Sequence, residues 1–566
     1  MNKILDQNKL EKNKNLNIFL INFVLVLIAI SAPWFSHSIA GHELIKSYFS
    51  FFGFGVLMFL FLYFKSKKPN ITLNINFIKL SLLLLFSFGT LSIFWSANID
   101  FTINKWLLWL TAFFSFIIAS NLSLNTNNLI KLSWGLLITS GCIALIGIIQ
   151  YLVDPFALTQ EAPPASTFAN RNIAAQPLIL AAPIFLFLLL SKYIYGVRVW
   201  LLSILTSFVF IYLFYTTSRG AWLSIFTEII LLTIYFIYYK LKKYRWIDWN
   251  SNKRNATICG LILIFIFCSL TPDGFVNVFN IANQEAASII GSIDNLSNEA
   301  VSESNTESWR YEIWKTGINM AYDSPIIGSG LGSFSHNLGN GGYSTWLINN
   351  TFRVHNDLIE LLVETGIIGI TFFAFVIISI ISSTVNILKN NNEESHLFFF
   401  IIFVALTGSF VNLQFSFPYQ MPFPLAIFGL YCGLISSQFD DINAPIKTIS
   451  IKLSKLIKKL LTMLFAGLLM ITFFFTYLDW IKVNYQLNKM NLTGDLNQIN
   501  IVETAIYNPR VQSMLYHLGG KYFRKGQYIQ SNAIDEQFLK FWPNHLDVLY
   551  RYAYSLHKLG QNDKAL

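Results

Sequence analysis

The stretch RVHNDLIELLVETGIIGITFFAFVIISIIS, residues 353–382, decides the class of fold. From Asp357 onward it is long and apolar enough to cross the roughly 30 Å hydrocarbon core of a bilayer as a helix. Its first turns nevertheless carry Asp357, Glu360 and Glu364, whose spacings of three and four place them along one face. Carboxylates are costly in lipid, so this face must pair with arginine or line a hydrated cavity, and structural pairing is favoured for the deepest, Glu364.

The apolar character extends over the whole chain. Of its 566 residues, 54% are hydrophobic and 12% are charged. Apolar runs of membrane-spanning length recur, separated by short polar loops. We therefore predict an all-α, polytopic transmembrane bundle with about thirteen spans, near residues 16–34, 46–64, 78–95, 105–121, 131–152, 172–191, 198–215, 221–239, 256–271, 357–386, 397–415, 421–437 and 460–478.

The basic residues indicate the orientation of these spans. Lysine and arginine gather in alternate loops, for example at Lys65–Lys68 and between Lys240 and Arg254, whereas loops 96–104 and 153–171 are nearly free of them. The positive-inside rule then predicts a cytoplasmic N-terminus and, for an odd number of spans, a C-terminus on the outer side of the membrane. This asymmetry explains the net charge of +10, and no nucleic-acid partner is expected.

Two soluble segments are expected on the outer side. The loop 272–356 divides the membrane helices into 1–271 and 357–480, and SESNTESWRYEIWKTGINMAYDSP within it predicts an amphipathic helix. A capping box of Ser304 and Glu307 would begin this helix, and Pro325 would end it.

The second soluble segment is the tail, 481–566. Residue pairs such as Pro509 with Pro543 and Gly526 with Gly560 recur there at 34 residues, which is the tetratricopeptide period. The second unit stops before a capping helix, so we expect an incomplete repeat module that docks on a partner protein or continues in a longer chain.

Three polar residues fall on the predicted outer side. Arg219 lies in SRGAW, Arg310 lies in the loop helix, and His355 lies where the loop re-enters the membrane. Each has a plainer interpretation: an arginine can snorkel or be solvated, and a lone histidine can bond a carbonyl. Together, however, they favour chemistry at a phosphorylated lipid, because arginine suits phosphate oxygens and histidine suits proton abstraction.

Four further residues are candidates for accessory roles: Asp357, Glu360, Asn356 and Arg171. Asp357 is expected to pair with an arginine rather than to orient the imidazole. The histidines and cysteines lack metal-ligand spacing, and there is no phosphate-binding glycine loop. No metal and no cofactor are therefore expected.

The order of three motifs carries a resemblance to a known family. SRGAW, then WRYEIWKTGINMAYDSPIIGSGLGSF, then VHNDLIELLVETGIIG resembles the O-antigen ligase and polymerase superfamily of bacterial envelopes, over roughly residues 160–440. The resemblance implies a metal-independent, inverting glycosyltransferase that moves a glycan from undecaprenyl pyrophosphate to an acceptor hydroxyl on the periplasmic face. It also implies that Arg219 and Arg310 bind the pyrophosphate and that His355 is catalytic.

The acceptor is left open by the resemblance. A ligase of lipopolysaccharide assembly would use lipid A core, a polymerase would use a second lipid-linked glycan, and a protein O-oligosaccharyltransferase would use a protein hydroxyl. A proton-coupled transporter is the alternative outside this class, since buried carboxylates also suit a carrier. Against it, the spans show no internal repeat of the kind that many carriers have.

Overall fold

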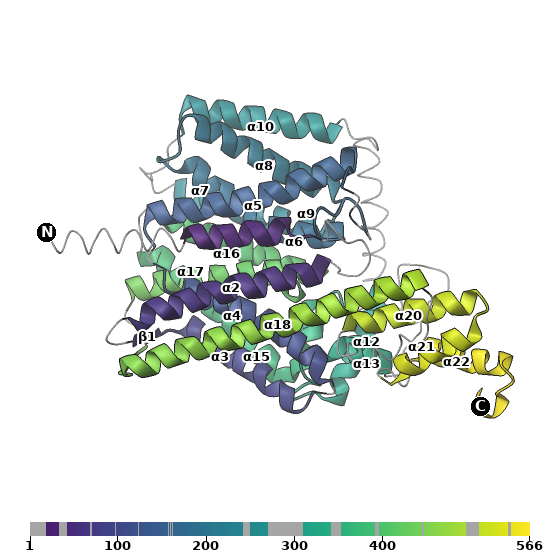
Figure 1. The fold of residues 1–566 in the computed structure, drawn as a ribbon. Helices are drawn as coiled ribbons and strands as arrows, with labels where there is room; N and C mark the ends of the chain where they lie inside the picture. Colours follow the sequence, from purple (N-terminus) through teal and green to yellow (C-terminus); the bar gives the residue numbers. More distant parts are fainter. Residues whose placement is uncertain are drawn as a thin grey trace.

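The computed structural model describes residues 18–32, 42–67, 71–96, 98–122, 124–156, 158, 160, 162–240, 249–269, 309–340, 353–390, 395–443, 446–493, 509–540 and 545–565. The chain is an all-α membrane bundle with one small sheet, as predicted (Figure 1). The helices before residue 309 are Ile18–Ile30, α2 His42–Ser66, α3 Phe77–Leu91, α4 Ile99–Ala119, α5 Thr126–Leu152, α6 Arg171–Ala181, α7 Ile184–Leu190, α8 Val197–Tyr215, α9 Arg219–Lys240 and α10 Ser251–Ser269.

The remaining elements complete the bundle and add an extension. They are α12 Trp309–Asp323, α13 Ser333–Asn340, α15 Asp357–Asn390, α16 Ser395–Asn412, α17 Pro422–Ile442, α18 Lys455–Thr493, and then α20 Pro509–Arg524, α21 Tyr528–Leu539, α22 Leu546–Lys558 and α23 Asn562–Ala565. Short 3-10 helices lie at η1 Ser92–Phe94 and η2 Pro418–Gln420.

The structure has a helix at each of the thirteen predicted span positions. Eleven described spans are long and apolar enough to cross a membrane, with α6 and α7 together forming one of them. The first expected span is represented by the shorter helix Ile18–Ile30, and the ninth by α10, which is not among the eleven. Eleven of the thirteen predicted spans are therefore supported.

Helix α17 forms the centre of the bundle. In its membrane-spanning window 94% of the residues are buried, the highest share among the described spans. It packs closely on α4, because Gly429 and Gly433 bring its backbone against Ala112 and Phe116. Small residues four apart allow such close approach between membrane helices.

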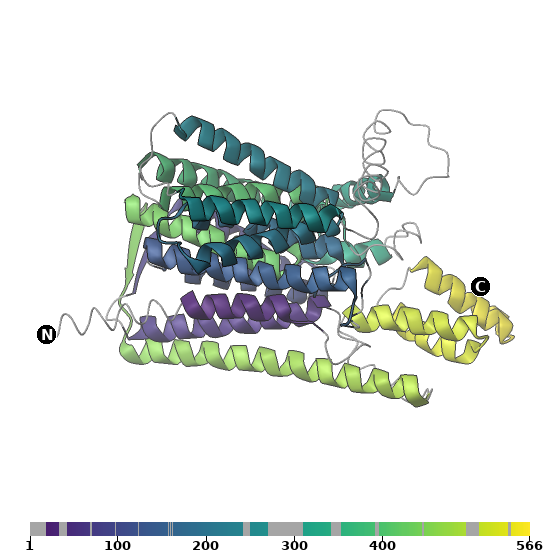
Figure 2. The same cartoon turned by 90° about the horizontal axis from the view of Figure 1, so that it is seen from above.

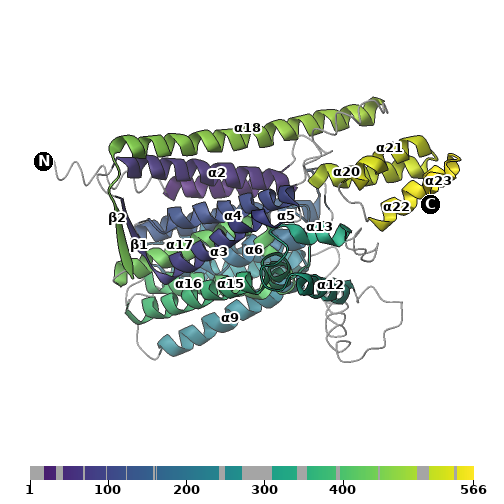
Figure 3. The same cartoon turned by 90° about the horizontal axis from the view of Figure 1, so that it is seen from below.

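The two ends of the bundle differ. At one end strands β1 (Ile71–Ile75) and β2 (Lys447–Ile451) form an antiparallel pair, which joins the end of α2 to the start of α18. At the opposite end lie α12, α13 and the helices α20–α23 (Figure 3). Helices α12 and α13 and the tail helices α20–α23 thus share one end of the molecule (Figure 2).

The loop helix and the tail helices agree in position with the sequence expectations. Helix α12 ends at Asp323, just before Pro325, while the expected capping box of Ser304 and Glu307 lies outside the described residues. The tail contains helical hairpins, and Gly526 and Gly560 take equivalent positive φ angles of 71° and 76° between paired helices. Their assignment as tetratricopeptide repeats stays a prediction. Helix α18, which precedes them, has 39 residues.

Candidate functional site

The loop 413–420 between α16 and α17 is the platform on which the site is assembled. The first residue of α15 docks on it through the backbone: the Asp357 N–H donates to Leu413 O at 3.0 Å. The Asp357 carboxylate in turn accepts the Tyr419 N–H at 2.9 Å. Helix α6 contacts the same loop from another side, because Gln176 Nε2 donates to Ser416 Oγ at 2.9 Å.

Asn356 begins α15. Its Oδ1 accepts the N–H groups of Leu358 and Ile359 at 3.0 and 3.2 Å, so it caps two donors that a helix start leaves unpaired. Its Nδ2 donates to Gln414 O at 3.2 Å. We conclude that Asn356 shapes the start of α15 and holds it on the platform loop.

His355 directly precedes this cap and has an unusual backbone. Its φ is 57°, in the left-handed region that few residues other than glycine adopt. The imidazole lies edge-on to the Phe417 ring, with centroids 4.9 Å apart. Burial, and after it the charges of Arg310 and Arg353, lower the pKa of His355 to about 4, while the charge of Glu360 opposes this shift. The imidazole is therefore neutral at pH 7 and able to accept a proton.

Arg310 reaches this place on α12. The helix packs against the start of α15 through a cluster that contains Ile313, Met320 and Val354. Gly317 lies so close to Ile359 that a Cβ there would be 2.8 Å from its Cγ2. Arg310, in the first turn of α12, is near enough to His355 to lower its pKa. The structure thus brings together two of the three predicted site residues.

Arg219 is the first residue of α9. It follows Thr217, whose φ of 48° turns the chain sharply between α8 and α9. A Cβ on the neighbouring Gly220 would lie 3.2 Å from Asn412 Nδ2 and 3.7 Å from Phe415 Cβ. The half-buried Arg219 therefore stands beside the loop that His355 contacts.

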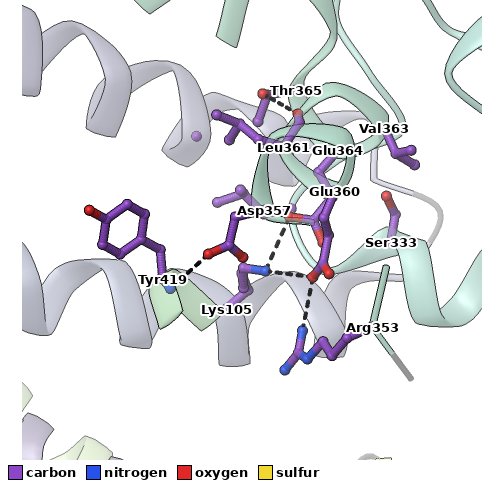
Figure 4. A network of polar contacts seen from close by, with 12 residues as sticks. Lys105, Ser333, Arg353, Asp357, Glu360, Leu361, Val363, Glu364, Thr365 and Tyr419 are labelled. Carbon is purple, nitrogen blue, oxygen red and sulfur yellow. Dashed lines mark hydrogen bonds and ion pairs between the residues drawn. The ribbon is translucent and has the colours of Figure 1, made fainter. Parts of the chain in front are cut away.

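The acidic face of α15 pairs with two cations that the sequence analysis did not single out (Figure 4). Glu360 Oε1 accepts from Lys105 Nζ at 3.2 Å and from Arg353 Nη1 at 3.1 Å. Glu364 also pairs with Lys105, at 3.3 Å, and Arg353 pairs with Glu43, at 3.3 Å. The pairing expected for Glu364 is thus observed, with lysine as the partner.

The expectation for Asp357 was wrong. Within the described part of the chain it forms no ion pair with an arginine; its carboxylate instead accepts the Tyr419 N–H. The nearest arginine in sequence, Arg353, is already paired with Glu360 and Glu43. Arg171 makes a local contact: its Nη1 donates to Pro163 O, in the loop that precedes α6, at 3.3 Å.

Helix α15 is broken just behind these residues. At Gly366 the backbone has φ 60° and ψ −165°, which is not helical. The segment 325–330 supplies the missing partners: Ser329 N and Gly330 N donate to Val363 O and Glu364 O, each at 2.9 Å. In the other direction Ile367 N and Ile368 N donate to Pro325 O and Ile326 O. The short half of α15, residues 357–365, is thereby fixed to the loop that follows α12.

An apolar cavity of about 100 Å³ adjoins the platform loop. Side chains of α3, α4, α15 and α17 line it, and Asp357 and Gln420 form its polar end. Asp357 Oδ1 and Gln420 Oε1 are buried there without a hydrogen-bond partner. Among the described residues, no group of three or more histidine, cysteine, aspartate or glutamate side chains is arranged to hold a metal.

A comparison with known families bears on the central part of the chain. Residues 201–374 match the family model described as O-antigen ligase. This match supports the resemblance to the O-antigen ligase superfamily. The family consists of membrane glycosyltransferases of the O-antigen ligase and polymerase type, which confirms the resemblance at this level. No curated protein shows significant similarity to the chain.

The O-antigen ligase domain contains all three predicted residues, Arg219, Arg310 and His355. The platform loop 413–420 and Lys105 lie outside the matched segment. The sequence held one signal for Lys105, since a lone cation inside an apolar run requires a buried partner. The platform loop had no such signal, because its role comes from backbone contacts.

Proposed function

We propose that the chain is an inner-membrane glycosyltransferase that moves a glycan from undecaprenyl pyrophosphate to an acceptor hydroxyl on the periplasmic face. The observation that carries this proposal is the convergence of three distant segments near His355 and the platform loop. His355 contacts Phe417, Arg310 acts electrostatically on His355, and the residue after Arg219 packs on Phe415.

The donor pyrophosphate would lie between the two arginines. A guanidinium binds phosphate oxygens with two parallel hydrogen bonds, and fixed cations stabilise the charge that builds as pyrophosphate leaves. Arg219 also stands at the N-terminus of the 22-residue helix α9, where the helix dipole favours an anion.

His355 would act as the general base. The acceptor hydroxyl attacks the anomeric carbon, its proton passes to the imidazole, and the carbon–oxygen bond to pyrophosphate breaks with its electron pair on the leaving group. One such displacement inverts the anomeric configuration. Burial and the two nearby arginines lower the pKa of His355 to about 4, and the negative charge of a bound pyrophosphate would raise it.

The orientation of the protein follows from its basic residues. Lys65 and Lys447 lie near the β1–β2 end, which the positive-inside rule assigns to the cytoplasm. The site end would then face the periplasm, where no ATP is available and an activated lipid-linked donor is needed. Alkaline phosphatase fused near Leu566 should be active, and an inactive fusion would overturn the orientation.

We favour a ligase-like acceptor, lipid A core, and a deletion strain separates the alternatives. Loss of a ligase leaves unligated lipid-linked polymer, loss of a polymerase leaves single repeat units on core, and loss of a protein O-oligosaccharyltransferase leaves unglycosylated proteins. Transport of a solute into liposomes without any glycan transfer would favour the carrier instead.

The central experiment measures glycan transfer by purified variants that reach normal membrane levels. Arg219→Lys should fail nearly as badly as Arg219→Ala, because lysine keeps the charge but loses the planar fork. His355→Ala should keep donor binding and lose about a hundred- to ten-thousand-fold in transfer, the range of a general base. Arg198→Ala, an exposed arginine at the start of α8, is the matched control and should transfer normally. Near-normal transfer by His355→Ala would reject the mechanism.

A further inference from the structure

The backbone at His355 needs support from its neighbours. A φ of 57° is unfavourable for a side chain with a Cβ, and such a conformation persists only where the surrounding structure fixes it. After His355 the chain is held by Asn356 and Asp357, both bonded to the platform loop. The direction of the imidazole therefore depends on what holds the chain before His355.

Glu360 holds that preceding residue. Its Oε2 accepts the Val354 N–H at 3.2 Å, and the Val354 side chain is fully buried. The contact thus links Glu360, one turn into α15, to Val354, the residue that directly precedes His355. One oxygen of the Glu360 carboxylate thus accepts the Val354 N–H, and the other oxygen contacts two cations.

The two cations anchor Glu360 to the membrane helices. Lys105 comes from α4 and donates to Glu360 Oε1 at 3.2 Å, while Arg353 donates to the same oxygen at 3.1 Å (Figure 4). Lys105 also pairs with Glu364, and Arg353 reaches Glu43 on α2. Charge pairs buried at 4% and 1% side-chain exposure, as for Lys105 and Glu360, have little freedom to rearrange.

We propose that Glu360, held by Lys105 and Arg353, is a positioning residue that fixes the Val354 backbone and so directs the His355 imidazole toward the acceptor hydroxyl. The proposal rests on the catalytic role proposed above for His355. Glu360 touches neither substrate in this arrangement and acts only through the geometry of residues 354 and 355.

Glu360→Gln tests this with little change in shape. Glutamine has one carboxamide oxygen, whereas Glu360 uses one oxygen for two cations and the other for Val354 N–H. Either orientation of the amide therefore places an NH2 group against the cations or against the Val354 donor. Each cation still keeps one carboxylate partner, Glu364 for Lys105 and Glu43 for Arg353, so folding should survive.

The expected result is a fall in kcat of roughly tenfold to a hundredfold, as when an outer residue that orients a functional histidine is lost. The KM for the lipid-linked donor should stay the same, because neither pyrophosphate-binding arginine is touched. Glu364→Gln is the matched control: it shares Lys105 but makes no contact with Val354, and its kcat should stay near normal. An equal loss in both variants would mean that the network is merely structural.

A double variant separates positioning from an independent role. In a His355→Ala background, Glu360→Gln should cause no further loss, since residues that act as one unit are not additive. The positioning role would be overturned if Glu360→Gln lowered the rate of His355→Ala by the same factor as it lowers that of the unmodified protein. A normal kcat for Glu360→Gln alone would also overturn it. Normal transfer by His355→Ala would instead overturn the proposed function itself.

A second pair of variants covers the case in which Glu360→Gln fails to reach the membrane. Arg353→Met removes one of the two anchors of Glu360 and should lower kcat without a change in donor KM. Arg353→Lys keeps a cation at this position and should restore part of the rate. Equal rates for the two Arg353 variants and the unmodified protein would overturn the proposal.

Discussion

The break in α15 predicts that Gly366→Ala is far more harmful than a matched glycine substitution elsewhere. Gly366 has φ 60° and ψ −165°, a conformation that is essentially restricted to glycine. A Cβ there would lie 2.4 Å from Ile326 O and 2.6 Å from Gly328 N, both backbone atoms. Backbone cannot move aside as a flexible side chain can, so the segment 325–330 must be displaced.

Gly196 provides the control. Its φ of 60° and ψ of −137° lie in nearly the same region, but nothing stands within 4 Å of its Cβ position. Both substitutions therefore carry a backbone strain of about 1–3 kcal/mol. Gly366→Ala also disturbs the hydrogen bonds from Ile367 N and Ile368 N, at about 0.5–1.5 kcal/mol each. We expect it to exceed Gly196→Ala by about 1–3 kcal/mol in free energy of unfolding.

The measurement is unfolding of the purified protein in micelles, followed by the fluorescence of its 14 tryptophans. Initial rates of glycan transfer from the same preparations show whether the short half of α15 has moved. Gly366→Ala should lower both stability and transfer, and Gly196→Ala should lower stability alone. Equal losses of stability in the two variants would refute the idea that segment 325–330 fills the break.

Three further results are expected. The acid limb of kcat/KM should lie near pH 4, because His355 has a pKa of about 4 and must be unprotonated to act as the base. The acid limb of kcat should lie at higher pH, since bound pyrophosphate raises that pKa. Acid limbs at the same pH in the two profiles would contradict this. Burial lowers the pKa of His545 from 6.5 to about 4, so its contribution to the stability of the tail is complete above pH 6.5 and is lost as the pH falls toward 4. His545→Asn, which keeps an acceptor for Val548 N–H, should lessen that loss in hydrogen exchange of α22 between pH 7 and pH 5. Transfer should survive EDTA, and loss on chelation that a divalent cation restores would reject metal independence.

Much of the fold could be predicted from hydropathy alone. The spans are long apolar runs whose hydrogen bonds are internal, so length and composition suffice to find them. The break at Gly366 was not predicted, because it requires partners from segment 325–330, which is distant along the chain. In an apolar run, a glycine alone does not distinguish a kink from close helix packing.

The site was predicted in part for a similar reason. Arg219, Arg310 and His355 stood out as polar residues on one predicted side; the structure places His355 and the residue after Arg219 against one loop and puts Arg310 near His355, while their roles stay a prediction. The partner of Asp357 could not be predicted, since a backbone N–H of Tyr419 leaves no trace in side-chain identity.

The length of α18 has a consequence for whatever the tail binds. At 1.5 Å per residue its 39 residues extend about 58 Å, nearly twice the thickness of the hydrocarbon layer. The candidate membrane span within it is Lys455–Phe474, and the 19 residues from there to Thr493 continue as about 28 Å of helix past that span. The distance from the candidate span to the end of α18 is therefore set by the number of helical turns. Removing seven residues, about two turns, would shorten it by about 10 Å, and the end of α18 would still point in nearly the same direction around the helix axis.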